Sequence, residues 1–201
     1  MSKDARKRIL EAASEAFSVY GYDKTTVEDI ARMADKAKAS VYYYFGGKAE
    51  ILEAALAEEV DTIRHRLSGC MNTCPSDITR SLGAYLKTRM DVVLESPLYM
   101  KFAVESLRRG NKSEPAGILI NARKPLDEAE EGFFEAVCRF ATASGALGDK
   151  VKPESFAEML SMVLRGGAEV QILLSDDRAA ARATYDEMVN FITNSDNFSS
   201  R

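Results

Sequence analysis

Apolar residues recur along most of this sequence with the spacing of an α-helix, and no segment alternates between apolar and polar residues as a half-buried strand does. The segment 4–20 shows the pattern clearly, and Gly21, a residue suited to the left-handed end of a helix, follows it. One stripe of this segment carries five residues: Ile9, Leu10, Ala13, Phe17 and Tyr20. The sequence therefore predicts an all-α protein of about nine helices.

Two shorter helices are expected within the first 50 residues. One begins at Thr25 or Thr26, where Thr25-Thr26-Val27-Glu28 fits a capping box whose carboxylate reaches back to the backbone. The other follows a break near 34–37 and places Val41 and Phe45 on its inner side. A helix, a tight turn and a short second helix form the geometry that enters the major groove of DNA.

The outer side of that short helix offers a cation, a hydroxyl, small side chains and phenols: Lys38, Ala39, Ser40, Tyr42 and Tyr43. Small residues allow close approach to base edges, and a tyrosine can contact a thymine methyl group or a phosphate. Lys48 opens the next helix, where a cation opposes the helix dipole unless a phosphate binds there, and Thr26 is placed for a similar contact. Taken alone, Lys48 would be interpreted as a solvated surface lysine, and a run of tyrosines such as this is more often a core segment than a DNA-binding one.

Charge is distributed unevenly along this chain of net charge −4. Residues 1–50 carry nine Lys or Arg against eight Asp or Glu, a net charge of +1, and the remaining residues carry a net charge of −5. A local basic region on an acidic protein is typical of binding to phosphate at one place. The N-terminal cations either contact phosphate or only form a charged terminus: Lys3, Arg6, Lys7 and Arg8.

The segment 6–56 resembles the DNA-binding domain of the TetR family in three elements at the family's spacing: Ile9 to Gly21, Thr-Thr-Val-x-x-Ile-Ala at 25–31, and Val-Tyr-Tyr-Tyr-Phe at 41–45 with Lys48. The resemblance implies a homodimer on a near-palindromic operator, usually a repressor that a small ligand releases. It implies a helix-turn-helix over about residues 26–45, a DNA-binding domain over 1–48 and a ligand-sensing and dimerisation domain over 49–201. The predicted DNA contacts are Thr26, Lys36, Lys38, Ala39, Ser40, Tyr42, Tyr43, Tyr44 and Lys48.

The turn before the recognition helix departs from the family's usual Ala-Gly-Val-Ser. Here it is Ala34-Asp35-Lys36-Ala37, so both the turn glycine and the serine that caps the helix are replaced. Loss of the capping hydroxyl weakens the helix by about 1 kcal/mol. The odd turn leaves room for a second hypothesis, an adaptor that keeps the fold without binding DNA.

Longer helices are expected after the N-terminal domain, over about 75–95, 97–109, 117–145, 153–175 and 178–194, with Pro125 kinking or splitting the third of them. The last two helices are the predicted dimer interface, which would form a four-helix bundle across two subunits. The first carries an apolar stripe with Gly166 and Gly167 for close approach, and the second adds Tyr185, Met188, Val189 and Ile192. Part of this stripe is equally suited to the core of one subunit.

A small-molecule effector is the expected ligand of the second domain, and the predicted ligand residues are Tyr85, Arg89, Phe102 and Phe133. Arg89 on an otherwise apolar stripe either meets an anionic ligand or is ion-paired within the protein. Cys70 and Cys74 are four residues apart near the single histidine, His65, but structural thiols are favoured over a redox or metal site, and no metal or cofactor is expected.

An enzyme is disfavoured, because the sequence holds one histidine and lacks a nucleophile triad, a metal cluster or a Gly-rich phosphate loop. No apolar run approaches the length of a membrane span, the N-terminus is polar, and the three cysteines form no disulfide framework. These features predict a cytoplasmic protein.

Overall fold

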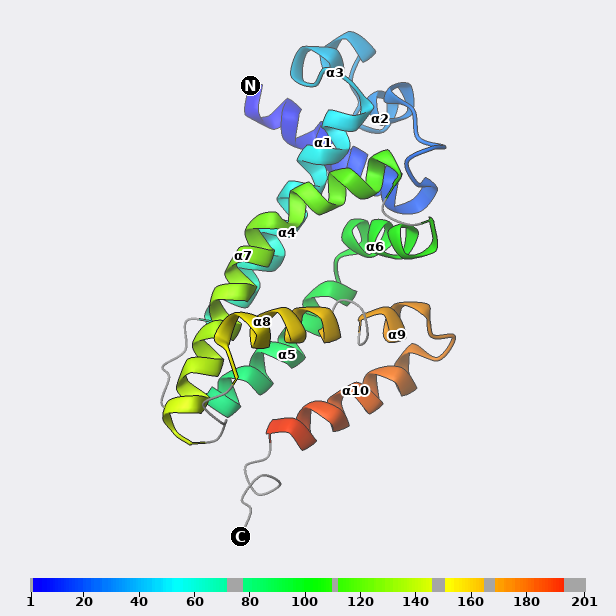
Figure 1. Cartoon of the computed structure of the whole chain (residues 1–201). Helices are drawn as coiled ribbons and strands as arrows, with labels where there is room; N and C mark the ends of the chain where they lie inside the picture. Colours follow the sequence, from blue (N-terminus) through cyan, green and yellow to red (C-terminus); the bar gives the residue numbers. More distant parts are fainter. Residues whose placement is uncertain (1, 72–77, 110–111, 146–150, 165–168, 194–201) are drawn as a thin grey trace. The chain divides into compact units, whose positions relative to one another are not determined.

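The computed structural model describes residues 2–71, 78–109, 112–145, 151–164 and 169–193. These ranges contain helices and no strand, which confirms the all-α prediction (Figure 1). The helices are α1 (Ser2–Tyr20), α2 (Val27–Met33), α3 (Lys38–Tyr44), α4 (Lys48–Met71), α5 (Ile78–Leu94), α6 (Pro97–Arg109), α7 (Glu114–Ala143), α8 (Pro153–Met162), α9 (Glu169–Leu174) and α10 (Arg178–Thr193).

Two compact units make up the chain. Unit 1 consists of Met1–Thr62 and Ser96–Lys124, and unit 2 consists of Ile63–Glu95 and Pro125–Arg201. These are packing units, so the functional boundary after residue 48 stays a prediction.

Unit 1 is built around the first three helices, in which α1 packs on α2, α3 and α6, and α2 packs on α3 (Figure 1). The predicted stripe of α1 lies in the core except for Tyr20, which is exposed. Val41 and Phe45 are 0% and 3% exposed, which confirms the predicted inner side of the short helix. Burying each of these large apolar side chains stabilises the folded protein by about 1.5–3 kcal/mol. The remaining large members of this core include Ile30, Ile51, Leu52, Leu56 and Phe102.

The connection from α1 to α2 is fixed by a left-handed glycine and a buried threonine. Gly21 has φ +79°, as predicted for the end of α1, and a Cβ atom there would lie 3.2 Å from a carboxylate oxygen of Glu105 on α6. The Thr25 hydroxyl is buried and donates to the Gly21 carbonyl oxygen at 2.7 Å. These contacts set the direction in which the chain enters α2.

A capping box does begin α2, but with different partners from those predicted. The Thr26 hydroxyl accepts from the backbone N–H of Asp29 at 3.1 Å, and the Asp29 carboxylate accepts from the backbone N–H of Thr26 at 3.2 Å. The prediction of Glu28 as the carboxylate was wrong by one residue, because with Thr26 as the cap the third helical position is Asp29. Glu28 is therefore available for another contact.

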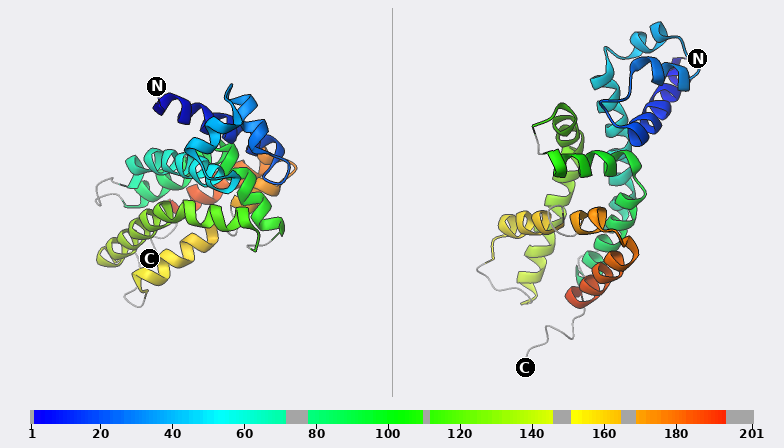
Figure 2. Two further views of the ribbon diagram at one scale, coloured as in Figure 1. Left: turned by 90° about the horizontal axis from the view of Figure 1, so that it is seen from above. Right: turned by 90° about the vertical axis from the view of Figure 1, so that its right-hand side faces the viewer.

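Unit 2 pairs α5 with α10, which pack on each other (Figure 1 and the right view of Figure 2). The Tyr185 hydroxyl donates to the Leu86 carbonyl oxygen at 3.0 Å, and Arg182 forms ion pairs with Asp91 and Asp186. A Cβ atom at Gly83 would lie 3.1 Å from the Thr193 side chain, so glycine permits the close approach of the two helices.

The predicted third long helix is continuous. The helix α7 extends from Glu114 to Ala143 with Pro125 inside it, so the proline does not split the helix. Proline removes one backbone hydrogen bond and hinders one carbonyl group, which a 30-residue helix with its many remaining bonds tolerates. The predicted helix over 153–175 is described as α8 and α9, and residues 165–168 between them lie outside the described ranges.

None of the helices in the described part of the chain combines the length and the hydropathy that a bilayer span requires.

Candidate nucleic-acid interface

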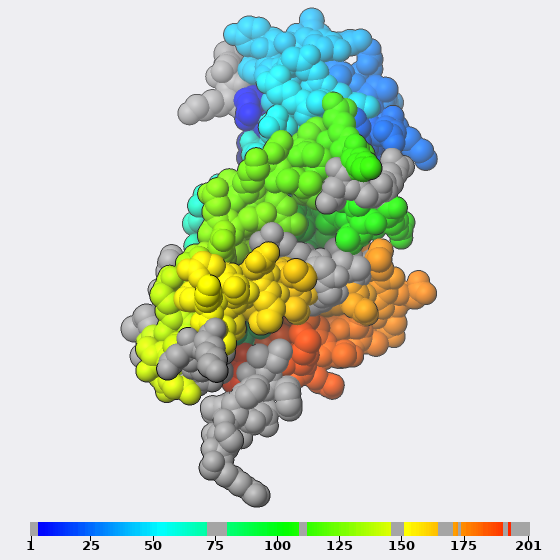
Figure 3. Space-filling model, in the orientation of Figure 1, coloured from blue at the N-terminus to red at the C-terminus, as the bar shows by residue number. Residues whose placement is uncertain are grey.

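The short helix α3 has two unlike sides, as the sequence predicted. Val41 lies in the core, whereas Tyr42 and Tyr43 are 48% and 80% exposed. Among the other predicted contacts, Thr26, Lys38 and Ala39 are exposed, and Lys36, Ser40, Tyr44 and Lys48 are partly exposed. The segment lies at the surface in the space-filling view (Figure 3). A seven-residue helix with this face fits a groove about 12 Å wide.

The tyrosine rings on this face are held in place by each other and by lysine. Tyr43 and Tyr44 pack edge to face with their ring centroids 4.9 Å apart. The Lys38 ammonium lies 5.7 Å from the centroid of the Tyr42 ring. Restricting these side chains before binding lowers the entropy cost of a contact with DNA.

Glu28 forms an ion pair with Lys38 across the helix-turn-helix, and sequence reasoning did not foresee it. The Lys38 ammonium donates to the Glu28 carboxylate, and this hydrogen bond holds the pKa of Glu28 below its usual value and that of Lys38 above it. Both side chains are about half exposed, so the pair contributes little to stability. When Lys38 approaches a phosphate, the negative charge of the paired Glu28 therefore also comes close to that phosphate.

Lys48 is held by a residue that sequence reasoning did not single out, Tyr22. The Lys48 ammonium donates to the Tyr22 carbonyl oxygen at 2.8 Å and lies 4.1 Å from the centroid of its ring. The Tyr22 hydroxyl in turn donates to the Glu114 carboxylate of α7 at 2.8 Å. Burial and the Glu114 carboxylate raise the pKa of Tyr22 to about 12, so the hydroxyl remains a donor at neutral pH.

The N-terminal cations form ion pairs on α1 and α4. Arg8 pairs with Asp4 and Lys7 with Glu11 one turn away. The Arg6 guanidinium lies 3.5 Å from the Glu58 carboxylate and 5.3 Å from the centroid of the Phe45 ring. Arg6 therefore lies near the C-cap residue of α3, Phe45. The Lys3 side chain lies outside the described residues.

The turn between α2 and α3 carries the two replacements that the sequence marked. Asp35 has φ +51°, the left-handed conformation that glycine adopts at less cost. Ala37 is the N-cap of α3 in an extended conformation, with no side-chain hydrogen bond to the helix. The backbone turn is kept without the residues that usually stabilise it.

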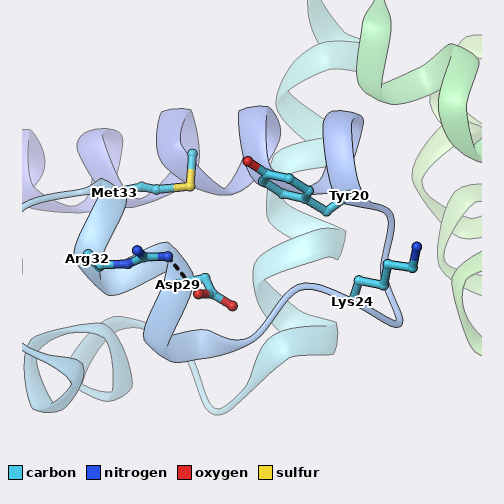
Figure 4. Close-up of a pocket in the computed structure, with 5 residues that line it drawn as sticks. All are labelled: Tyr20, Lys24, Asp29, Arg32 and Met33. Atoms are coloured by element: carbon cyan, nitrogen blue, oxygen red, sulfur yellow. Dashed lines mark hydrogen bonds and ion pairs between the residues drawn. The ribbon is translucent and has the colours of Figure 1, made fainter.

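A separate hollow of about 500 Å³ lies where the end of α1 and the α1–α2 connection meet α2 (Figure 4). It is lined by Tyr20, Lys24, Asp29, Arg32 and Met33, and Arg32 pairs with Asp29 at 2.9 Å. None of the predicted DNA contacts lines this hollow. The Asp29 carboxylate is also part of the capping box, so its negative charge helps to stabilise the N-terminal end of α2.

Three of the four predicted ligand residues come together in unit 2. The buried Arg89 Nε and the buried Tyr85 hydroxyl donate to the same Glu130 oxygen, at 2.7 and 2.6 Å. The Tyr85 and Phe133 rings lie 5.0 Å apart, and burial raises the pKa of Tyr85 well above its usual value. Arg89 is thus ion-paired within the protein, the second of the two sequence alternatives. Phe102 belongs to unit 1, where its ring lies 6.4 Å from that of Phe17.

The end of unit 2 formed by α8, α9 and α10 exposes large apolar side chains. They are Met159, Met162, Val163, Leu174 and Met188, and we call them the α8–α10 face. An apolar hollow of about 390 Å³ beside it is lined partly by Val163, Ile172 and Met188. Tyr185 and Val189 of the predicted interface are buried within the subunit instead. Gly166 and Gly167 lie outside the described residues, as does the Ile192 side chain.

The cysteines show no metal chemistry within the described ranges. Cys138 is buried, and the Cys70 thiol lies 3.6 Å from the Thr88 hydroxyl. Cys74 lies outside the described residues. Among the residues described, no group of three or more His, Cys, Asp or Glu side chains is arranged to hold a metal ion.

Comparisons with known proteins place this geometry among regulators of transcription. A family profile described as "Bacterial regulatory proteins, tetR family" matches residues 9–55. The uncharacterized HTH-type transcriptional regulator TtgW of Pseudomonas putida is 43% identical over 137 residues, 68% of this chain and 93% of TtgW. The HTH-type transcriptional regulator LmrA of Bacillus subtilis is 35% identical over 85 residues, 42% of this chain and 45% of LmrA. The chain thus spans about half the length of LmrA.

Solved structures share the fold over nearly the whole chain. The transcriptional regulator FadR from Bacillus subtilis, solved in complex with stearoyl-CoA, superposes with a TM-score of 0.73. The superposition covers 94% of this chain and 97% of FadR at 16% sequence identity. At that identity the likeness concerns the fold, and the described helix-turn-helix and the helices that follow match it.

Proposed function

Because the chain belongs to the TetR family of bacterial transcriptional regulators and carries its DNA-binding helix-turn-helix, we propose that it is a dimeric repressor, working in the cytoplasm, that a small ligand releases from a near-palindromic operator. The proposed DNA contacts are those predicted from the sequence: Thr26, Lys36, Lys38, Ala39, Ser40, Tyr42, Tyr43, Tyr44 and Lys48.

The observation that carries this proposal is the two-sided α3. Its inner side is fixed by Val41 in the core, so its outer side is presented as a rigid surface. Tyr42 and Tyr43 are 48% and 80% exposed, so two adjacent phenols are available to contact bases and phosphates. In a helix-turn-helix the second helix lies in the major groove with such side chains on base edges and phosphates.

The test is operator binding by the wild-type chain and two matched variants. A duplex chosen by selection from random sequence is titrated at several salt concentrations, with fluorescence anisotropy as the measurement. Tyr43→Ala is expected to weaken binding at least about tenfold, because each specific contact contributes about 1–3 kcal/mol. Lys124→Gln, at an exposed lysine of α7, is the control and is expected to change binding little. If no sequence is enriched and no duplex binds at low salt, the adaptor hypothesis replaces this one.

We propose the α8–α10 face as the dimer interface. Exposed methionines, valine and leucine on neighbouring helices favour contact with an apolar partner, and a second copy offers the same surface by two-fold symmetry. Met162→Glu is expected to shift the protein from dimer to monomer in sedimentation experiments, because Met162 is 67% exposed in the isolated subunit. Leu107→Glu, at an exposed leucine of unit 1, is the control and is expected to leave the dimer intact.

The proposed effector site contains Tyr85, Arg89 and Phe133, which lie together in unit 2, and Phe102 of unit 1 stays a separate prediction. Since Glu130 neutralises Arg89, we expect a mainly apolar effector that accepts or donates a hydrogen bond rather than a simple anion. The bound stearoyl-CoA of FadR makes long-chain acyl compounds reasonable first probes. Acyl-CoA thioesters of increasing chain length are added to the protein–operator complex. Release by one of them, lost in Phe133→Ala, supports the site.

A further inference from the structure

Lys48 and the connection between α1 and α2 form one contact network in unit 1. The Lys48 side chain begins at the first residue of α4 and ends against Tyr22, 26 residues earlier in the chain. Its ammonium meets both the carbonyl oxygen and the ring face of Tyr22, at 2.8 Å and 4.1 Å to the centroid. Two independent attractions of one residue therefore restrict a side chain that is otherwise among the most flexible in proteins.

Two contacts besides Lys48 hold the Tyr22 side chain in place. It is 8% exposed and stacks on Phe17, with the centroids 6.0 Å apart and an interplanar angle of 25°. Its hydroxyl donates to the Glu114 carboxylate at 2.8 Å. A rigid ring is a better platform for a cation than a mobile one, because less entropy is lost when the contact forms.

We propose that Tyr22 is a positioning residue for DNA binding, which holds the Lys48 ammonium at the place where it meets a backbone phosphate. This inference depends on the proposed role of Lys48 in binding DNA. The carbonyl oxygen takes one of the three N–H donors of the ammonium and the ring face meets a second, so the third remains for a phosphate oxygen. The Tyr22 ring supports the cation from one side, so the phosphate meets a pre-ordered charge.

The experiment is a double-mutant cycle in the full chain, with a selected operator duplex as the probe. Tyr22→Leu is expected to raise the dissociation constant of the complex between the dimer and the operator about tenfold, because each of the two subunits loses one cation–ring contact. Lys48→Met is expected to raise it at least about 100-fold and to reduce the slope of log affinity against log salt by about 2. The double variant is expected to bind as weakly as Lys48→Met alone, because the ring acts through the ammonium.

Two further variants separate positioning from general packing. Tyr22→Phe keeps the ring and the backbone carbonyl, so it is expected to bind the operator within about twofold of wild type. Tyr20→Leu, at an exposed tyrosine two residues away, is the control and is expected to leave the affinity unchanged. Losses for Tyr22→Leu and Lys48→Met that multiply in the double variant would overturn the positioning role. A wild-type chain that binds no duplex would instead overturn the proposed function.

A measurement on the wild-type protein keeps the test valid if Tyr22→Leu does not fold. An aromatic ring shields protons that lie over its face, so the ε-methylene protons of Lys48 are expected to resonate upfield of those of the other lysines. The Lys48→Met variant assigns the signal, and Tyr22→Phe is expected to preserve its shift. Lys48 protons at the ordinary lysine position in the folded wild-type protein would contradict the ring contact and overturn the proposal.

Discussion

Removing Glu130 is expected to destabilise unit 2 severely. Glu130 and Arg89 are each 1% exposed, and their charged atoms lie 2.7 Å apart. Glu130→Leu would leave the guanidinium buried without its carboxylate, and the loss of one member of a buried ion pair costs about 3–5 kcal/mol. The Tyr85 hydroxyl loses its acceptor in the same variant, which adds about 1 kcal/mol.

The partner variants determine whether charge or packing is responsible. Arg89→Met alone is expected to destabilise less at pH 5 than at pH 8, because the buried carboxyl of its folded state can take up a proton. Arg89→Met combined with Glu130→Leu is expected to be nearly as stable as wild type, since apolar residues of similar volume can replace a buried pair. The loss in the double variant is therefore much smaller than the sum of the two single losses.

Urea unfolding at both pH values, followed by circular dichroism, measures these free energies, and thermal melts should show a fall of about 10 °C for Glu130→Leu. The reasoning would be refuted if Glu130→Leu cost less than about 1 kcal/mol, the value expected for an exposed pair. Additive losses in the double variant would refute it equally, because they would show that the two side chains do not depend on each other.

Four further predictions concern unit 1. Ala37→Thr is expected to be about 0.5–1 kcal/mol more stable than Ala37→Val in urea unfolding, because only threonine caps α3 with a hydroxyl. Asp35→Gly is expected to stabilise by about 0.5–1 kcal/mol, since φ is +51° there, and a lower melting temperature would contradict this. Glu28→Gln is expected to strengthen binding to DNA of random sequence, because a carboxylate beside Lys38 is removed. The slope of log affinity against log salt concentration is expected to become steeper by about 1–2, and an unchanged slope would show that Glu28 does not affect the contact of Lys38 with phosphate. The pKa of Tyr22 is raised from 10.0 to about 12, so its contribution to stability is full below pH 10 and is lost as pH rises towards 12, a loss that Tyr22→Phe should not show.

Local pattern was enough to predict which residues of α3 are buried and which are exposed. The helical period placed Val41 and Phe45 inside and Tyr42 and Tyr43 outside, because residues three or four apart share a side of a helix. It also placed Gly21 at the left-handed end of α1 and gave α6 its observed bounds. The sequence also showed that Asp35 replaces the usual turn glycine, and the structure gives it the left-handed conformation, with φ +51°. Each of these features depends on residues within a few positions of each other.

Only the tertiary structure decided which charged groups meet. The partners Lys48 and Tyr22 are 26 residues apart in sequence, and Arg89 and Glu130 are 41 apart, so no periodicity relates them. The capping carboxylate fell on Asp29 rather than Glu28, because two adjacent threonines left the helix start open by one residue. Short-range spacing fixes which side of a helix a residue occupies, whereas the approach of distant helices, set by core packing, fixes what that residue touches.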